Sequence, residues 1–204
     1  RTTVTLPMRG KYIAADFLND MYTRGETAQG EAAVELAPGQ SMLFLFGGVS
    51  DEEWAAFPAK TEGTRTELLD TLWDIDLRET GREADFRPFR RQTKLFNMTG
   101  RDGEREFSGE MRYRTCVTLD KAVHMELEFE HVGMTARLFV NGKDMGQRIC
   151  APYRWHITEA VQQGKNEIEV LAANTLVQRM QDGFSAYMPI PASGLTGAVT
   201  LHRK

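Results

Sequence analysis

The sequence predicts a mostly β protein, an antiparallel sandwich or barrel, from three observations. The dominant hydrophobic period is two, and Met125–Glu130 alternates apolar and acidic residues without a break. Predicted strands recur about every 8–12 residues with Gly- and Asn-containing turns between them. Helix signals are few and short, so no helical layer is expected.

In the N-terminal part, the strands and a single short helix follow one another closely. A capping box at Ser50–Glu53 predicts a helical turn or two that reaches Phe57 and stops at Pro58. Pro38-Gly39 separates the last two of the predicted strands. These strands are Val4–Leu6, Lys11–Phe17, Ala32–Leu36 and Ser41–Phe46.

The C-terminal part carries the stronger alternation. Asn141-Gly142 suits a type I′ hairpin turn, since both residues adopt positive φ at low cost. Thr158 is expected to cap a short helical turn that ends at Gly164. The predicted strands are Tyr113–Leu119, Met125–Glu130, Ala136–Val140, Ile168–Leu171 and Ala198–His202.

A polar stretch rich in Gly and Thr, residues 60–66, predicts a boundary between two parts. Residues 1–58 are expected to be a β-rich segment, either the end of a neighbouring β-domain or a region packed on the second part. Residues 59–67 are the predicted linker, and residues 68–204 the predicted main domain.

Length and composition describe an ordinary globular chain. Its 204 residues are 41% hydrophobic and 26% charged, and the net charge is −4. This acidic balance argues against a nucleic-acid partner, which requires a basic surface. The longest apolar run, Met42–Phe46, is far shorter than the ~18–20 residues of a membrane span, so no membrane partner is expected. Two cysteines, Cys116 and Cys150, are expected to be free thiols, with one isolated bridge as the alternative.

An ordered series of motifs in residues 68–204 resembles a known family of domains. It resembles the jelly-roll, galactose-binding-like domain of β-galactosidase/β-glucuronidase glycoside hydrolases, and still more the C-terminal β-domains of large bacterial α-L-rhamnosidase-type enzymes. The motifs are Phe107-Ser108-Gly109 before Tyr113, Val140-Asn141-Gly142 before Gly146, Pro152, Ile157-Thr158, Gly164-x-Asn166-x-Ile168-x-Val170, Asn174-Thr175 and Ser193-Gly194-Leu195-x-Gly197-x-Val199.

The resemblance implies a non-catalytic accessory domain of a larger glycoside hydrolase, with Trp73–Leu77 as the entry strand of that domain. In that family the catalytic carboxylates lie on a (β/α)₈ barrel elsewhere in the polypeptide, and this chain is too short for a barrel of ~250 residues. The implied partners are carbohydrate and the catalytic domain of the same polypeptide. Two alternatives stay open: a free-standing carbohydrate-binding module, and a structural or adhesion β-sandwich without a sugar site.

No catalytic residue is expected in this chain. Glycoside hydrolysis needs a pair of carboxyl groups in different environments, whereas Glu126, Glu128 and Glu130, and likewise Asp74 and Asp76, alternate along strands as solvated faces do. The four histidines lack the usual zinc spacings, although two of them, His131 and His156, could meet across a sheet. No metal site or cofactor is therefore expected, with a structural calcium on backbone carbonyls the one form that sequence does not reveal.

Carbohydrate contact is expected where aromatic rings stand beside planar polar groups. The candidates are Tyr153, Arg154 and Trp155, together with Tyr187 in the long loop after Asn174, and Asn174 itself. For Tyr153 and Trp155 a packing role at a corner of the fold is the favoured alternative. The basic residues between Arg87 and Lys94 are expected to form a solvated loop rather than an anionic-glycan site.

Overall fold

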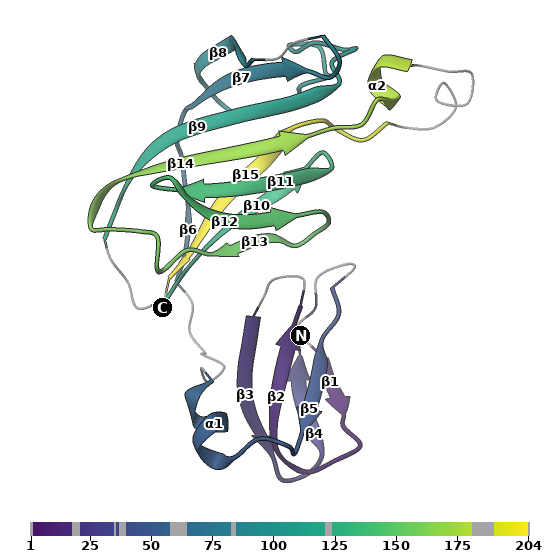
Figure 1. Cartoon of the computed structure of the whole chain (residues 1–204), viewed down its shortest axis with the longest axis vertical. Helices are drawn as coiled ribbons and strands as arrows, with labels where there is room; N and C mark the ends of the chain where they lie inside the picture. Colours follow the sequence, from purple (N-terminus) through teal and green to yellow (C-terminus); the bar gives the residue numbers. More distant parts are fainter. Residues whose placement is uncertain are drawn as a thin grey trace. The chain divides into compact units, whose positions relative to one another are not determined.

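The computed structural model describes residues 2–17, 21–34, 36, 40–57, 65–82, 85–120, 124–180 and 190–203. The chain forms two compact units, Arg1–Thr64 and Arg65–Lys204 (Figure 1). All strand pairings of the described residues are antiparallel. The predicted all-β class is confirmed. Neither helix among these residues is long and apolar enough to cross a membrane.

The first unit contains two small sheets. One sheet pairs β1 (Thr2–Thr5) with β4 (Glu31–Val34). The other has the order β3-β2-β5, with β3 at Met21–Thr27, β2 at Gly10–Asp16 and β5 at Leu43–Phe46. β3 was not predicted, because its sequence MYTRGET lacks an alternating apolar face.

The predicted short helix is α1 (Asp51–Ala56), and both halves of its capping box form. The backbone N–H of Glu53 donates to Ser50 Oγ at 3.2 Å, and the N–H of Ser50 donates to Glu53 Oε2 at 2.8 Å. Because each partner satisfies a backbone donor of the first turn, a helix of this short length is stable at its N-terminus.

The second unit has two larger sheets (Figure 1). The four-stranded sheet has the order β13 (Tyr153–His156), β10 (Met125–Val132), β15 (Leu195–Arg203) and β6 (Arg65–Leu68). The six-stranded sheet has the order β12 (Lys143–Arg148), β11 (Thr135–Val140), β14 (Gly164–Ala173), β9 (Gly109–Leu119), β7 (Trp73–Glu79) and β8 (Arg87–Thr93). A short helix, α2 (Val177–Met180), follows β14.

One hydrophobic core joins these two sheets. The ring of Phe129 on β10 lies 6.2 Å from Trp73 on β7 and 5.9 Å from Trp155 on β13, centroid to centroid. Strand β9 shows the predicted alternation, with Met111, Tyr113 and every second residue after them facing the core. Two antiparallel sheets that share one core form a β-sandwich, as the period of two predicts.

The hairpin between β11 and β12 turns at Asn141-Gly142, where φ is +51° and +78°. Positive φ at both central residues is what a type I′ turn requires, so this prediction is confirmed. The preference of Asn and Gly for that region explains the dipeptide.

Three local predictions differ from the structure. Residues 158–160 form a turn rather than a helix. The basic stretch after Arg87 is strand β8, paired with β7 at the edge of the sheet, rather than a loop. Charged side chains on an edge strand discourage pairing with other chains. Residues 65–67 of the predicted linker belong to β6, which pairs with β15.

Candidate functional site

The predicted carbohydrate contacts on β13 point to opposite sides of the strand. Trp155 lies in the core with 1% of its surface exposed, and its indole N–H donates to the Gly146 carbonyl at 3.0 Å. No face of that ring is open for stacking on a sugar. Tyr153 is half-buried on the same side, and its hydroxyl donates to the Met134 carbonyl at 2.8 Å. Arg154 points to the outer face of the sheet, where Glu128 accepts its hydrogen bond at 2.7 Å.

Asn174 uses its whole amide to join three segments of the sandwich. Its Nδ2 donates to the Phe107 carbonyl at 2.8 Å and to Ser193 Oγ at 2.7 Å, and its Oδ1 accepts from the Gly109 N–H at 2.8 Å. This side chain therefore fixes the starts of β9 and β15 against the end of β14. Tyr187 lies outside the described residues.

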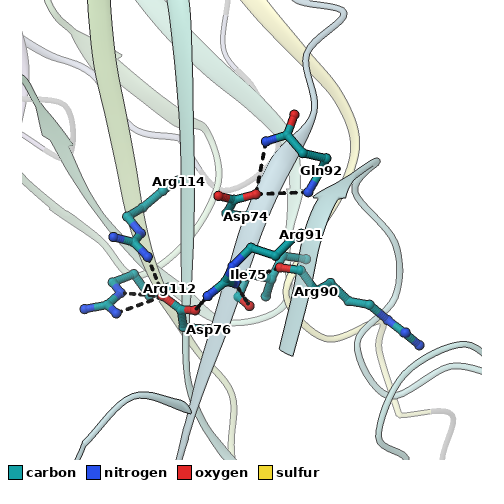
Figure 2. A network of polar contacts seen from close by, with 8 residues as sticks. All are labelled: Asp74, Ile75, Asp76, Arg90, Arg91, Gln92, Arg112 and Arg114. Atoms are coloured by element: carbon teal, nitrogen blue, oxygen red, sulfur yellow. Dashed lines mark hydrogen bonds and ion pairs between the residues drawn. The ribbon is translucent and has the colours of Figure 1, made fainter. Parts of the chain in front are cut away.

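The six-stranded sheet carries a charged network on its outer face (Figure 2). Asp76 on β7 is buried, with 2% of its side chain exposed, and accepts from three arginines. The guanidinium groups of Arg91, Arg112 and Arg114 lie 2.6, 2.8 and 2.8 Å from its carboxylate oxygens. Arg91 comes from β8 and the other two from β9, so the network joins three neighbouring strands.

These contacts decide the charge of Asp76. Burial favours the neutral form, but the hydrogen bonds from Arg112 and Arg91 and the charges of Arg91 and Arg114 outweigh it and hold its pKa below the usual range. Nearby, the backbone and side-chain N–H groups of Gln92 lower the pKa of Asp74. The prediction that Asp76 lies on a solvated face is wrong, because the side chains of Arg91 from β8 and of Arg112 and Arg114 from β9 enclose its carboxylate.

A shallow hollow of about 500 Å³ adjoins the network on the same face. Its polar lining includes the carboxylates of Asp70, Asp74 and Glu167, the Gln92 amide and Arg114. Such groups suit hydroxyl-rich ligands, yet an exposed aromatic platform does not line it.

A second polar cluster lies on the outer face of the four-stranded sheet. The register places Glu126 opposite His156 on β13 and opposite His202 on β15. The Nε2 atom of His124 lies 3.0 Å from Glu126 Oε1, and the imidazole rings of His124 and His156 are 4.4 Å apart. His131 and His156 do not meet across the sheet, because His156 lies opposite Glu126 and His131 lies opposite Thr196 on β15. The exposed His131 ring instead has its Nε2 atom 3.6 Å from Glu130 Oε1.

Of the three acidic residues of β10 that were predicted to be solvated, Glu130 is exposed, but Glu126 and Glu128 are not. Glu126 is only 6% exposed. Burial favours the neutral form of Glu128, but Arg154 and His202 donate to it and their charges hold its pKa below the usual value. Alternation correctly predicted which residues share this face, but strands β13 and β15 supply the partners that sequence reasoning missed.

The fold occurs in solved structures as part of much larger hydrolases. The chain is similar to a rhamnosidase from Novosphingobium sp. PP1Y, with a TM-score of 0.70 and 23% identity over 99% of this chain and 21% of that one. It is also similar to a β-glucuronidase from Ruminococcus gnavus, with a TM-score of 0.50 and 16% identity over 72% of this chain and 30% of that one. This likeness shows an architecture that glycoside hydrolases contain.

Sequence comparison points to the same group of proteins. A relative from Formosa agariphila, named as a β-glucuronidase, is 28% identical over 94 residues. The match covers 44% of this chain and 8% of the relative. No protein-family model matches the chain. The chain thus corresponds to a small share of each protein it resembles.

Proposed function

We propose that the chain is a non-catalytic accessory region of a larger glycoside hydrolase. In this proposal, residues 65–204 are a galactose-binding-like jelly-roll domain and the first unit is the end of a neighbouring β-domain. The observation that carries the proposal is the coverage: 99% of this chain aligns with 21% of a rhamnosidase.

The role we assign to the region is positional. The side-chain contacts of the second unit support rigidity, because Asn174 joins three segments and Asp76 joins three strands. A rigid sandwich that packs beside a catalytic domain of the same polypeptide holds that domain and the rim of its sugar pocket in place. Carbohydrate is the second partner, with Tyr153 and Arg154 as the candidates among the described residues.

The chemistry of the described residues supports a non-catalytic role. Asp76 and Glu128, the most enclosed carboxylates with shifted pKa values, both have lowered values. A general acid in a glycosidase needs a raised pKa, so that it carries a proton at neutral pH. These two carboxylates are therefore suited to binding arginine and not to protonating a leaving group.

The decisive experiment is to sequence the source gene on both sides of this segment and to assay the products. We expect a reading frame that adds a barrel-sized region, and hydrolysis of nitrophenyl glycosides by the full product but not by residues 1–204. Turnover by residues 1–204 alone would contradict the proposal, as would a gene that ends at both borders of this segment.

A glycan array with the 204-residue chain and its Tyr153→Ala variant tests the carbohydrate partner. Binding that the substitution abolishes supports contact at Tyr153. Strong binding by a gene product without further domains favours a free-standing carbohydrate-binding module. An array without any signal limits the region to a structural role.

A further inference from the structure

Two imidazoles and one carboxylate converge at the edge of the four-stranded sheet. One ligand atom from each of His124, Glu126 and His156 lies within 4.8 Å of the other two. Two histidines and one carboxylate are a donor set that binds Zn²⁺ and related transition metals. We infer that these three residues form a site for one divalent transition-metal ion of the zinc type.

The backbone holds the ligands in place before any ion binds. Glu126 follows Met125 and His156 precedes Ile157, and both of these neighbours are completely buried. The Ile157 N–H donates to the Met125 carbonyl at 2.8 Å, and the Met125 N–H donates to Thr158 Oγ1 at 2.7 Å. Core packing and the ladder between β10 and β13 thus fix the two ligands opposite each other, which lowers the entropy cost of binding.

The surrounding charged groups leave one carboxylate oxygen of Glu126 available to a cation. Arg154 lies 3.7 Å from Glu126 Oε2 but only 2.7 Å from Glu128, so Glu128 is its main partner. The other oxygen, Glu126 Oε1, faces His124 at 3.0 Å. With two glutamates and one arginine, this side of the sheet carries excess negative charge when its imidazoles are neutral.

The distances require only a small adjustment. A tetrahedral ion with bonds of about 2.0–2.1 Å holds its ligand atoms about 3.4 Å apart. The His124–Glu126 pair, at 3.0 Å, needs to open slightly, whereas the widest pair within the 4.8 Å limit needs to close. Rotation of the imidazole side chains supplies this motion. The ion replaces the hydrogen bond of the His124–Glu126 pair, and neutral His124 then carries its proton on Nδ1, so that Nε2 offers its lone pair to the metal. Three protein ligands leave a fourth position for water or for an oxygen of a bound ligand.

The three ligand types also determine which metal ions the site prefers. Imidazole nitrogen suits zinc, nickel, copper and cobalt, whereas calcium and magnesium take oxygen ligands. Sequence spacing did not predict the site, because His156 comes from a different strand and joins the His-x-Glu segment 124–126 only through the register of β10 and β13.

The test is titration of the tag-free 204-residue chain with Zn²⁺ by calorimetry and with Co²⁺ by visible absorption. We expect one ion per chain, a tetrahedral cobalt spectrum and no comparable binding of Ca²⁺. His124→Ala and His156→Ala should each weaken binding at least ~10-fold, and Glu126→Gln should weaken it similarly. His131→Ala is the matched control. His131 lies on β10, as Glu126 does, but outside the cluster, so its substitution should leave binding unchanged.

Two further readouts make the outcome decisive. Absence of a thiolate-to-cobalt band excludes capture of the ion by the exposed Cys116 and Cys150. Zn²⁺ should raise the Tm of the native chain and of His131→Ala, but not of folded His156→Ala, because an ion that binds only the native state stabilises it. The inference is overturned if the native chain does not bind Zn²⁺ at about 1 mM. It is also overturned if the folded variants His124→Ala and His156→Ala bind Zn²⁺ as tightly as the native chain does.

Discussion

The side-chain amide of Asn141 donates a hydrogen bond of 2.8 Å to Oδ1 of Asn166. Asn141 is the first residue of the β11–β12 turn, and Asn166 lies near the start of β14. Asn141 Oδ1 also accepts from the Glu167 N–H at 2.9 Å. Two turns that the sequence marks as separate motifs are therefore one hydrogen-bonded unit.

Asn166→Ala should destabilise the fold by about 2–4 kcal/mol, because it leaves several enclosed polar groups without partners. Asn166 is completely buried, donates to the Gln162 and Gly164 carbonyls and accepts from the Gln162 N–H, each at 2.8 Å. Chemical denaturation measures the loss. Lys165→Ala, at the exposed neighbouring position, is the control, and equal stability of the two variants would show that the Asn166 contacts contribute nothing.

Asp76→Asn should cost about 2–4 kcal/mol of unfolding free energy, since three guanidinium groups lose the carboxylate that they share. The arginines are 28% to 44% exposed at their side chains and can turn partly to water, which limits the loss. Asp70→Asn is the matched control, because Asp70 forms an exposed pair with Lys94. A Tm for Asp76→Asn equal to that of the control contradicts a stabilising network.

Protonation of the Asp76 carboxylate should lower the stability of the fold at acid pH. The folded pKa of Asp76 is below its unfolded value of about 3.9, so its contribution is complete above that pH and is lost as the pH falls through the folded pKa. The pKa of Glu128 is likewise lowered in the folded state, from an unfolded value of about 4.3, so Glu128 also contributes stability that is lost as the pH falls. Unfolding free energy measured between pH 7 and pH 2 should decline below about pH 4.5, and less steeply for Asp76→Asn. Parallel curves for the two proteins would rule out this role of Asp76.

Trp155→Ala should destabilise the sandwich by about 3–5 kcal/mol, because it removes a completely enclosed ring from the core. Tyr153→Phe should have a much smaller effect, since it removes only the hydroxyl that donates to Met134. Thermal unfolding of both variants checks the difference. Similar losses at the two positions would mean that the β13 corner is not organised around Trp155.

Much of the fold could be predicted because alternation is a local property. Every second residue of β9 and β10 faces one side of the strand, and the sequence displays that period directly. The capping box of Ser50 and the turn at Asn141-Gly142 are equally local, since each depends on neighbouring residues. β3 has no comparable local signal, and its pairing with β2 decides its conformation.

The candidate site could be predicted only in part. Arg154 lies on an outer face, but Trp155, its neighbour, points inward, because adjacent strand residues face opposite sides. The sequence also contained no sign that Asn174 would be used entirely by Phe107, Gly109 and Ser193, which are distant along the chain.

The sequence by itself determined the β class, the turns and the set of residues that share each strand face, because these follow from backbone preferences and a period of two. Only the tertiary structure decided which faces meet water. Asp76 and Glu126 alternate as solvated residues do, yet neighbouring strands bring arginines to the first and histidines to the second. Strand order and register are set by the packing of the whole core, and they alone determine which charges become partners.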